Sequence, residues 1–302
     1  MRKQWLIPII GTVGNFFSVI MMWFFPILIA MFILNGVFHI SDNIILTIVV
    51  LFVLGYPMYL FYLGASGKGE GLVKKYLPSR QLSLEEEKFL LPLIEEVLNK
   101  HNQLSGTNLR YGQEIRFSIA EDDTINAFAF GKTHVIFNSG FFSIPDTSVF
   151  KAVLAHEVAH LHHKDTLISL TNFFVQRPTQ IVLNIFNSYK VMGYLADVAK
   201  NRKGAGDKVM VNLIFKVLFL PALVIGLVVN FICDTTQKIL SKQQELAADA
   251  HAVKLGYLDG LLQFLEIVDK NHIKPNRMVR LFETHPEPKF RIEYAKSISI
   301  TN

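Results

Sequence analysis

The segment from His156 to His160 carries two imidazoles four residues apart, with the carboxylate of Glu157 directly after the first. Residues four apart lie on one face of an α-helix, so both rings can reach a single metal ion. Glu157 points about 100° further round the helix. From there it can act on water as a general base without binding the metal, and this division of roles is typical of a zinc hydrolase.

Apolar residues recur around this motif with helical spacing, among them Val149, Val153 and Val158. The pattern predicts a buried helix that carries the motif. A core helix whose histidines are satisfied by neighbouring side chains is the alternative interpretation. A third ligand from elsewhere in the chain is needed to decide between the two.

A second segment, residues 241–250, is rich in Ala, Leu, Gln and Lys and is followed by Gly256, which predicts another helix. Glu245 and Asp249 lie one turn apart on one face of it. The first carboxylate can bind a metal, and the second can accept a hydrogen bond from a ligand histidine. Two ordinary solvated acids have the same spacing, so the residues alone leave both interpretations open.

Four ordered motifs together resemble the HtpX-like family of membrane zinc endopeptidases, which is related to the CAAX prenyl endopeptidases. The resemblance covers about residues 120–295, and its motifs are His156 to His160, Ser241 to Asp249, Asn126 to Gly131, and Thr284-His285-Pro286 with Arg291.

The resemblance implies one zinc ion per chain, bound by His156, His160 and Glu245. It implies that Glu157 is the catalytic base and that Asp249 supports a ligand from behind.

The same resemblance implies further site residues. His285 and Arg291 are expected to stabilise the transition state or to orient the ligands. Asn126, Ala127 and Phe128 are expected on a substrate-facing strand edge, where an extended peptide can pair through main-chain hydrogen bonds.

Composition favours a membrane enzyme. Hydrophobic residues make up 51% of the chain and charged residues 18%, and the mean hydropathy is +0.33. Between Gln4 and Gly67 the only charged residue is Asp42. Residues 5–34 and 44–63 are each long enough to cross a hydrocarbon core of about 30 Å. A cleaved signal peptide needs a shorter apolar region and a small-residue cleavage site, so we interpret the first block as an uncleaved anchor.

Basic residues flank this apolar hairpin at both ends, and the connection 35–43 has no Lys or Arg. The positive-inside rule therefore predicts that both ends of the hairpin, and with them the catalytic domain, face the cytoplasm. The expected location is the cytoplasmic (inner) membrane, as a multi-pass protein. A pI of about 9.1 is explained by juxtamembrane basic residues near anionic lipid, so the expected partners are the bilayer and polypeptide substrates rather than nucleic acid. The oligomeric state is not predicted.

Two further apolar blocks, residues 167–186 and 211–233, precede Glu245. Arg177 lies near the centre of the first, where an arginine disfavours a full membrane span. The family resemblance implies two further membrane helices, so we expect both blocks to be embedded in the membrane and leave full spanning open. The predicted layout is a transmembrane hairpin at 1–67, a first catalytic part at 68–165, a hydrophobic hairpin at 166–235 and a second catalytic part at 236–302.

The remaining pattern predicts an α+β fold, a zincin-like mixed α/β catalytic domain that follows the N-terminal transmembrane hairpin and into which the second hydrophobic hairpin is inserted. A helix is expected over 84–102 and a strand over 115–120. Residues 126–130 and 134–138 flank Gly131-Lys132 and predict a hairpin.

The expected activity is zinc-dependent hydrolysis of peptide bonds, and the family resemblance implies quality control of misfolded or surplus membrane proteins. Three alternatives remain: a narrower processing protease similar to the prenyl endopeptidases, a membrane scaffold with a vestigial zinc motif, and a membrane regulator that binds zinc without cleaving.

Overall fold

A computed structural model describes residues 55–175, 240–271 and 287–301, together with a few single positions between 43 and 51. The chain divides into two compact units, one comprising residues 1–65 and 171–237 and the other residues 66–170 and 238–302. In the first unit the described part includes helix α3 (Tyr56–Ala65). The second unit contains the sheet and the motifs of interest, and is described below.

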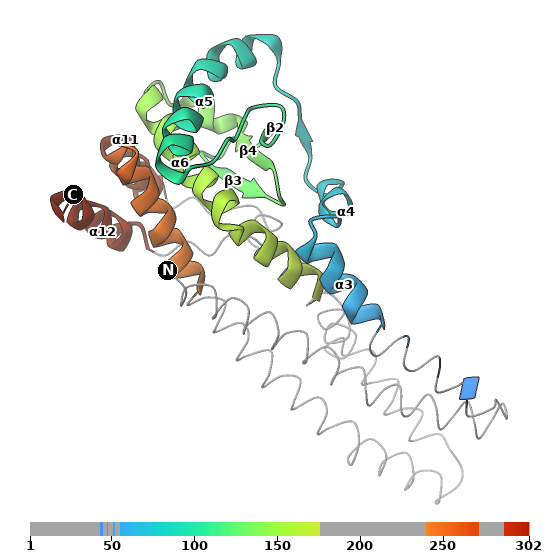
Figure 1. The fold of residues 1–302 in the computed structure, drawn as a ribbon. Coiled ribbons are helices and arrows are strands. Elements are labelled where there is room, and N and C mark those ends of the chain that lie inside the picture. Colours follow the sequence, from blue (N-terminus) through green and yellow to red (C-terminus); the bar gives the residue numbers. More distant parts are fainter. Residues whose placement is uncertain are drawn as a thin grey trace, which may run out of the picture. The chain divides into compact units, whose positions relative to one another are not determined.

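A four-stranded mixed sheet, in the order β1-β2-β4-β3, lies at the centre of the second unit (Figure 1). Its strands are β1 (Ser79–Arg80), β2 (Arg116–Ala120), β3 (Ala127–Phe130) and β4 (His134–Asn138). β2 and β4 are parallel, and β3 returns antiparallel beside β4 through the predicted hairpin. β3 is therefore an edge strand, with Ala127 opposite Phe137 and Ala129 opposite Val135.

Helix α5 (Leu84–Ser105) confirms the helix expected over 84–102. A capping box begins it, because the Ser83 hydroxyl accepts from the Glu86 N–H while the Glu86 carboxylate accepts from the Ser83 N–H. Gly106, with φ of 66°, ends it in the left-handed conformation that glycine adopts without strain.

Helix α6 (Thr147–His163) carries the two-histidine motif and begins where the Asp146 side chain accepts from the Ser148 N–H. It packs against α5, β3 and α11, and all of its residues from Ala152 to His160 are buried (Figure 1). Phe150 stacks on Phe137 of β4 with 4.8 Å between ring centroids, which joins the helix to the sheet. The predicted buried helix is confirmed.

Three further elements close the unit: α4 (Glu70–Lys74), α11 (Leu258–Asn271) and α12 (Pro288–Thr301). Residues 240–254 are also helical, as predicted, and Gly256 follows with φ of 85°. α11 passes very close to α6, since a Cβ atom on Gly260 would lie 2.2 Å from the Ser148 carbonyl oxygen. Only glycine permits this approach, which brings the C-terminal helices onto the motif helix.

The mixed α/β character of the catalytic part is thus confirmed. The predicted apolar blocks at 5–34 and 211–233 lie outside the described residues, as do part of 44–63 and most of 167–186. Within the described part of the chain, no helix combines the length and the apolarity that a membrane crossing requires.

Candidate metal centre

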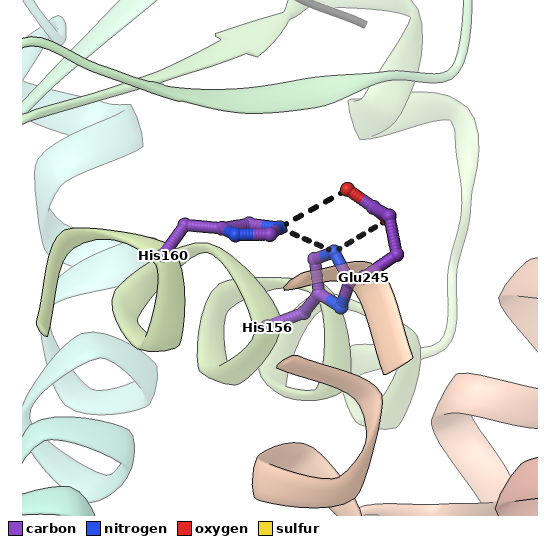
Figure 2. Close-up of side chains that lie close together, drawn as sticks. All are labelled: His156, His160 and Glu245. Carbon is purple, nitrogen blue, oxygen red and sulfur yellow. Dashed lines mark hydrogen bonds and ion pairs between the residues drawn. The ribbon is translucent and has the colours of Figure 1, made fainter. Parts of the chain in front are cut away.

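His156 and His160 project from one face of α6, and their rings meet edge to face with 4.7 Å between centroids (Figure 2). Their Nε2 atoms lie 3.1 Å apart. Both residues are buried, with relative exposures of 4% and 8%. Helical spacing has therefore brought two imidazole nitrogens together inside the protein, as the sequence predicts.

Glu245, on the helical segment 240–254, faces both rings. One carboxylate oxygen lies 3.3 Å from the His156 Nε2 atom, and the other lies 3.3 Å from the His160 Nε2 atom. Tetrahedral zinc with ligands at 2.0–2.2 Å places neighbouring donor atoms about 3.3 Å apart. Among the described residues, this is the group of three His, Cys, Asp or Glu side chains whose ligand atoms converge in a manner that can hold a metal ion.

A carboxylate lies behind each of the two rings. The Nδ1 atom of His156 is 2.9 Å from Asp249, and the Nδ1 atom of His160 is 3.0 Å from Asp165. A carboxylate accepts and does not donate, so each neutral imidazole keeps its proton on Nδ1 and presents a lone pair at Nε2. The Nε2 atoms and Glu245 are then three electron-rich groups in contact, an arrangement that can hold a metal ion between them.

The pKa values of the histidines point the same way. Burial acts to lower the pKa of His156, but the charges of Glu245 and Asp249 outweigh it and raise that pKa above its usual value. For His160 burial is again outweighed, by Asp165 and Glu245, and the pKa is raised well above its usual value. Positive charge is favoured at this position, whether a proton or a metal ion carries it.

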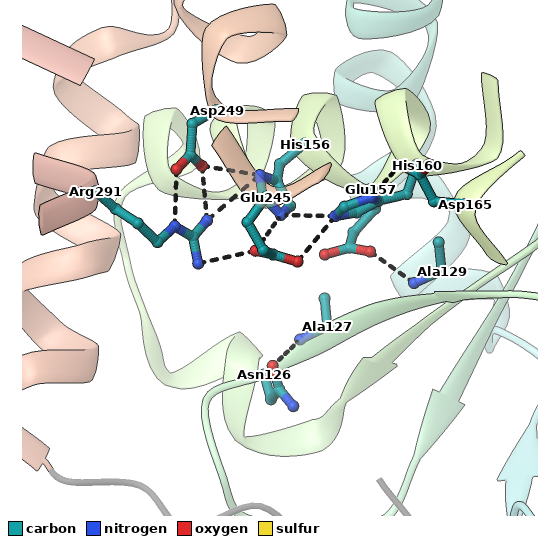
Figure 3. A network of polar contacts seen from close by, with 10 residues as sticks. All are labelled: Asn126, Ala127, Ala129, His156, Glu157, His160, Asp165, Glu245, Asp249 and Arg291. Atoms are coloured by element: carbon teal, nitrogen blue, oxygen red, sulfur yellow. Dashed lines mark hydrogen bonds and ion pairs between the residues drawn. The ribbon is translucent and has the colours of Figure 1, made fainter. Parts of the chain in front are cut away.

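Arg291 of α12 reaches the centre from the C-terminal end of the chain (Figure 3). Its Nε and Nη2 atoms donate to the two oxygens of Asp249 at 2.7 and 2.6 Å, and its Nη1 atom lies 3.2 Å from Glu245. Burial acts to raise the pKa of Asp249, but Arg291 outweighs it and holds that pKa at about 2. Arg291 is thus paired with Asp249, which lies behind His156, and with Glu245, one of the three converging donors.

The carboxylate of Glu157 lies beside the ligand cluster, on the side that faces strand β3 (Figure 3). The backbone N–H of Ala129, on edge strand β3, donates to its carboxylate at 2.6 Å. Glu157 has a relative exposure of 4%. It is therefore a buried carboxylate beside the two histidines, held from the strand side and separate from the three converging donors.

The structure brings together most of the residues predicted from sequence. The predicted residues at the centre are His156, Glu157, His160, Glu245, Asp249 and Arg291. Asn126 lies at the start of β3, where its side-chain oxygen accepts from the Ala127 N–H at 2.9 Å (Figure 3), and Phe128 is a buried residue of that strand. His285 lies outside the described residues.

Sequence reasoning missed the role of Asp165, which it could equally read as the cap of the next helix. α6 ends at His163, and the next residue, Lys164, has a left-handed φ of 61° that turns the chain so that Asp165 faces back to His160. An acidic residue directly after a two-histidine helix is the available signal, although spacing alone does not reveal the turn that aims it.

Comparison with known proteins places this geometry in a family. The model of Peptidase family M48 matches residues 94–299. A "Protease HtpX homolog" of Dictyoglomus thermophilum is 25% identical over 244 residues, covering 73% of each chain. One of Helicobacter acinonychis is 28% identical over 242 residues, covering 71% of this chain and 72% of the relative.

Among solved structures, the crystal structure of S. mikatae Ste24p aligns with 98% of this chain and 66% of its own, at 15% identity and a TM-score of 0.45. The family match extends over most of the chain and includes the motif helix, Glu245 and Arg291. The chain therefore belongs to peptidase family M48, as an HtpX-like metalloendopeptidase.

Proposed function

We propose that this metalloendopeptidase is a zinc enzyme of the membrane that hydrolyses peptide bonds of membrane or misfolded proteins in protein quality control. The observation that carries the proposal is the convergence of two histidine Nε2 atoms and one carboxylate at 3.1–3.3 Å, each ring supported from behind by an aspartate. That spacing and that donor set suit zinc with an open fourth position.

In this proposal His156, His160 and Glu245 hold one zinc ion. Zinc in such a site lowers the pKa of water and polarises a peptide carbonyl. Glu157 accepts the proton of the attacking water and passes it to the leaving amine. Its hydrogen bond from Ala129 fixes the carboxylate between the donors and the strand, where a peptide lying along that strand would bring its scissile bond.

The supporting residues hold this arrangement in place. Asp249 and Asp165 fix the orientation of the two rings through Nδ1. Arg291 offsets the charges of Asp249 and Glu245, and its contacts favour the orienting role over the role of oxyanion donor. We propose that His285 donates a hydrogen bond that stabilises the transition state.

Edge strand β3 is the proposed platform for substrate. The Asn138 N–H donates to the Asn126 carbonyl, so by antiparallel alternation Ala127 and Ala129 turn their N–H and C=O groups away from β4. The Ala127 N–H is satisfied by the Asn126 side chain. We infer that a substrate carbonyl replaces this side-chain oxygen when an extended peptide pairs with Asn126, Ala127 and Phe128.

The membrane part of the proposal rests on the apolar blocks and on their flanking charges. We propose the layout 1–67, 68–165, 166–235 and 236–302, with both catalytic parts on the cytoplasmic side of the inner membrane. A site close to the bilayer selects substrates by location as well as by sequence.

The test is digestion of an unfolded protein such as casein by the purified, zinc-loaded chain and by its Glu157→Gln variant. The wild type should cleave at several positions, and the variant should retain its zinc while losing at least 10²- to 10⁴-fold in rate, because one general base is removed. Hydrolysis by Glu157→Gln at the wild-type rate would refute the proposed mechanism. The inactive variant can then capture natural substrates from membranes.

A further inference from the structure

The short helix α4 joins the turn of the β3–β4 hairpin through one carboxylate. Glu70 accepts a hydrogen bond from the backbone N–H of Lys132 at 3.0 Å, and its other oxygen pairs with the Nδ1 atom of His134. The side chains of His134 and Glu70 are 8% and 14% exposed. A largely buried contact thus links residues that are more than sixty positions apart in the chain.

The imidazole of His134 lies between two groups of opposite charge. Its Nε2 atom is 3.1 Å from the ammonium of Lys74. Since an ammonium only donates and a carboxylate only accepts, the proton belongs on Nδ1 and the lone pair on Nε2. Glu70, His134 and Lys74 therefore form a directed set in which both ring nitrogens have a partner.

The turn itself is shaped to receive Glu70. Gly131 has φ of 62°, and a Cβ atom there would lie 2.3 Å from a Glu70 carboxylate oxygen. From the other side, the Thr166 hydroxyl donates to the Gly131 carbonyl at 2.5 Å. The turn is held by the segment that precedes the sheet and by the segment that follows α6.

This turn is the end of the strand that faces the catalytic base. His134 is the register partner of Phe130, the last residue of β3, and Ala129 donates to Glu157 one residue earlier. Among the described residues β3 has a neighbour strand on one side, so its position depends on β4 and on what holds the turn. β3 is only four residues long, so a displacement of the turn would also displace the proposed substrate-binding edge of this strand.

We propose that Glu70 is a positioning residue for peptide hydrolysis, which acts by fixing the β3–β4 turn and thereby the edge strand opposite Glu157. The inference rests on the proposed function, because it takes β3 to be the strand that binds substrate. Glu70 lies far from the metal donors in the sequence, yet its replacement is expected to impair peptide hydrolysis.

The test compares Glu70→Ala and Glu70→Gln with Glu85→Ala, in the full-length zinc-loaded enzyme. Glu85 is the matched control, because it is also a first-turn helical acid but is exposed and lies on α5. With a peptide long enough to lie along β3, Glu70→Ala should raise KM about tenfold or more and change kcat less, since a misplacement of about 1 Å is costly. Glu70→Gln, which can still accept from Lys132, should recover part of the loss.

A purely structural role would reduce kcat with the folded fraction and leave KM unchanged. Amide exchange of Ala129 should also accelerate in Glu70→Ala and not in Glu85→Ala. If Glu70→Ala and Glu70→Gln both bind the long peptide with the wild-type KM while the wild type is active, the positioning role is wrong and the proposed function stands. An inactive wild type would instead refute the proposed function.

Discussion

Two buried histidine pairs lie close to α6 in the described part of the chain, and they differ in what surrounds them. The Nε2 atoms of His156 and His160 are 3.1 Å apart, while the Nδ1 atom of His101 is 2.8 Å from the Nε2 atom of His251. Three carboxylates, from Glu245, Asp249 and Asp165, contact the first pair. The second pair has histidine neighbours, His162 and His163.

The electrostatic outcome is opposite in the two places. Burial dominates at the second pair and lowers the pKa of His101 to about 4 and that of His251 to about 3. At the first pair the carboxylates overcome burial and raise both pKa values. Clustered imidazoles therefore do not define a metal site by themselves, because the surrounding carboxylates decide whether a cation is favoured.

Replacing one histidine of each pair should give the largest difference. His160→Gln removes a proposed zinc ligand and should lower the rate of casein hydrolysis by at least about 10³-fold, since the metal contributes several kcal/mol to the barrier reduction. His251→Gln should leave the rate per folded molecule within a few-fold of the wild type. If circular dichroism shows that both variants are folded and they lose activity to a similar extent, the proposed difference between the two histidine pairs is wrong.

Breaking the buried ion pair behind the centre should have the next largest effect. Arg291→Met leaves the carboxylate of Asp249, at 0% exposure, without its permanent cation and with only the His156 ring as a partner, so the free energy of unfolding should fall by about 3–5 kcal/mol in denaturant titrations. Arg80→Met removes the exposed pair with Glu86 and should cost far less. Equal losses in the two variants would show that burial does not set the strength of the pairs at the centre.

Asp165→Asn tests the carboxylate behind His160. The amide can still accept a hydrogen bond but carries no charge, so zinc affinity measured by competition with a chelator should fall about 10- to 100-fold. Asp123→Asn, at an exposed position outside the centre, is the control and should not change it. Unaltered affinity in Asp165→Asn would mean that the hydrogen bond alone orients the ring.

The lowered pKa values of His101 and His251 should make the stability of the protein depend on pH. The ordinary pKa of 6.5 applies in the unfolded chain, while the folded chain holds His101 near 4 and His251 near 3. As the pH falls below 6.5, the unfolded chain takes up protons that the folded chain resists, so stability is lost on acidification.

Between pH 7 and 5.5 each of the two histidines should contribute about 1.2 kcal/mol to this loss, so the wild type should lose about 2.5 kcal/mol of unfolding free energy more than a His101→Leu, His251→Leu double variant. Thermal or denaturant unfolding of both proteins across this range gives the difference. Parallel stability curves would contradict the lowered pKa values.

The parts of the site that the sequence predicts are those set by local periodicity. Helical spacing alone puts His156 and His160 on one face, and it puts Glu245 and Asp249 one turn apart. The β3–β4 hairpin follows from alternation around a glycine turn. Each of these features depends on residues fewer than about ten positions apart.

Other contacts depend on the tertiary fold. The His101–His251 pair joins residues 150 positions apart, and Arg291 meets His156 across 135 positions. Glu70 reaches His134 only because α4 lies against the hairpin turn. A single sequence contains no periodic signal for such long-range contacts. For this reason the sequence alone does not decide whether Glu245 and Asp249 belong to a metal site or are ordinary solvated acids, and it gives no role to Glu70.

The zinc content of three purified proteins tests the central claim most directly. Wild type, Glu245→Ala and His251→Gln are dialysed against a chelator, reloaded with limiting zinc and measured by elemental analysis. We expect one zinc per chain in the wild type and in His251→Gln, and a loss of tightly bound zinc in Glu245→Ala. Undiminished stoichiometry and affinity in Glu245→Ala, or loss of zinc in His251→Gln, would contradict it.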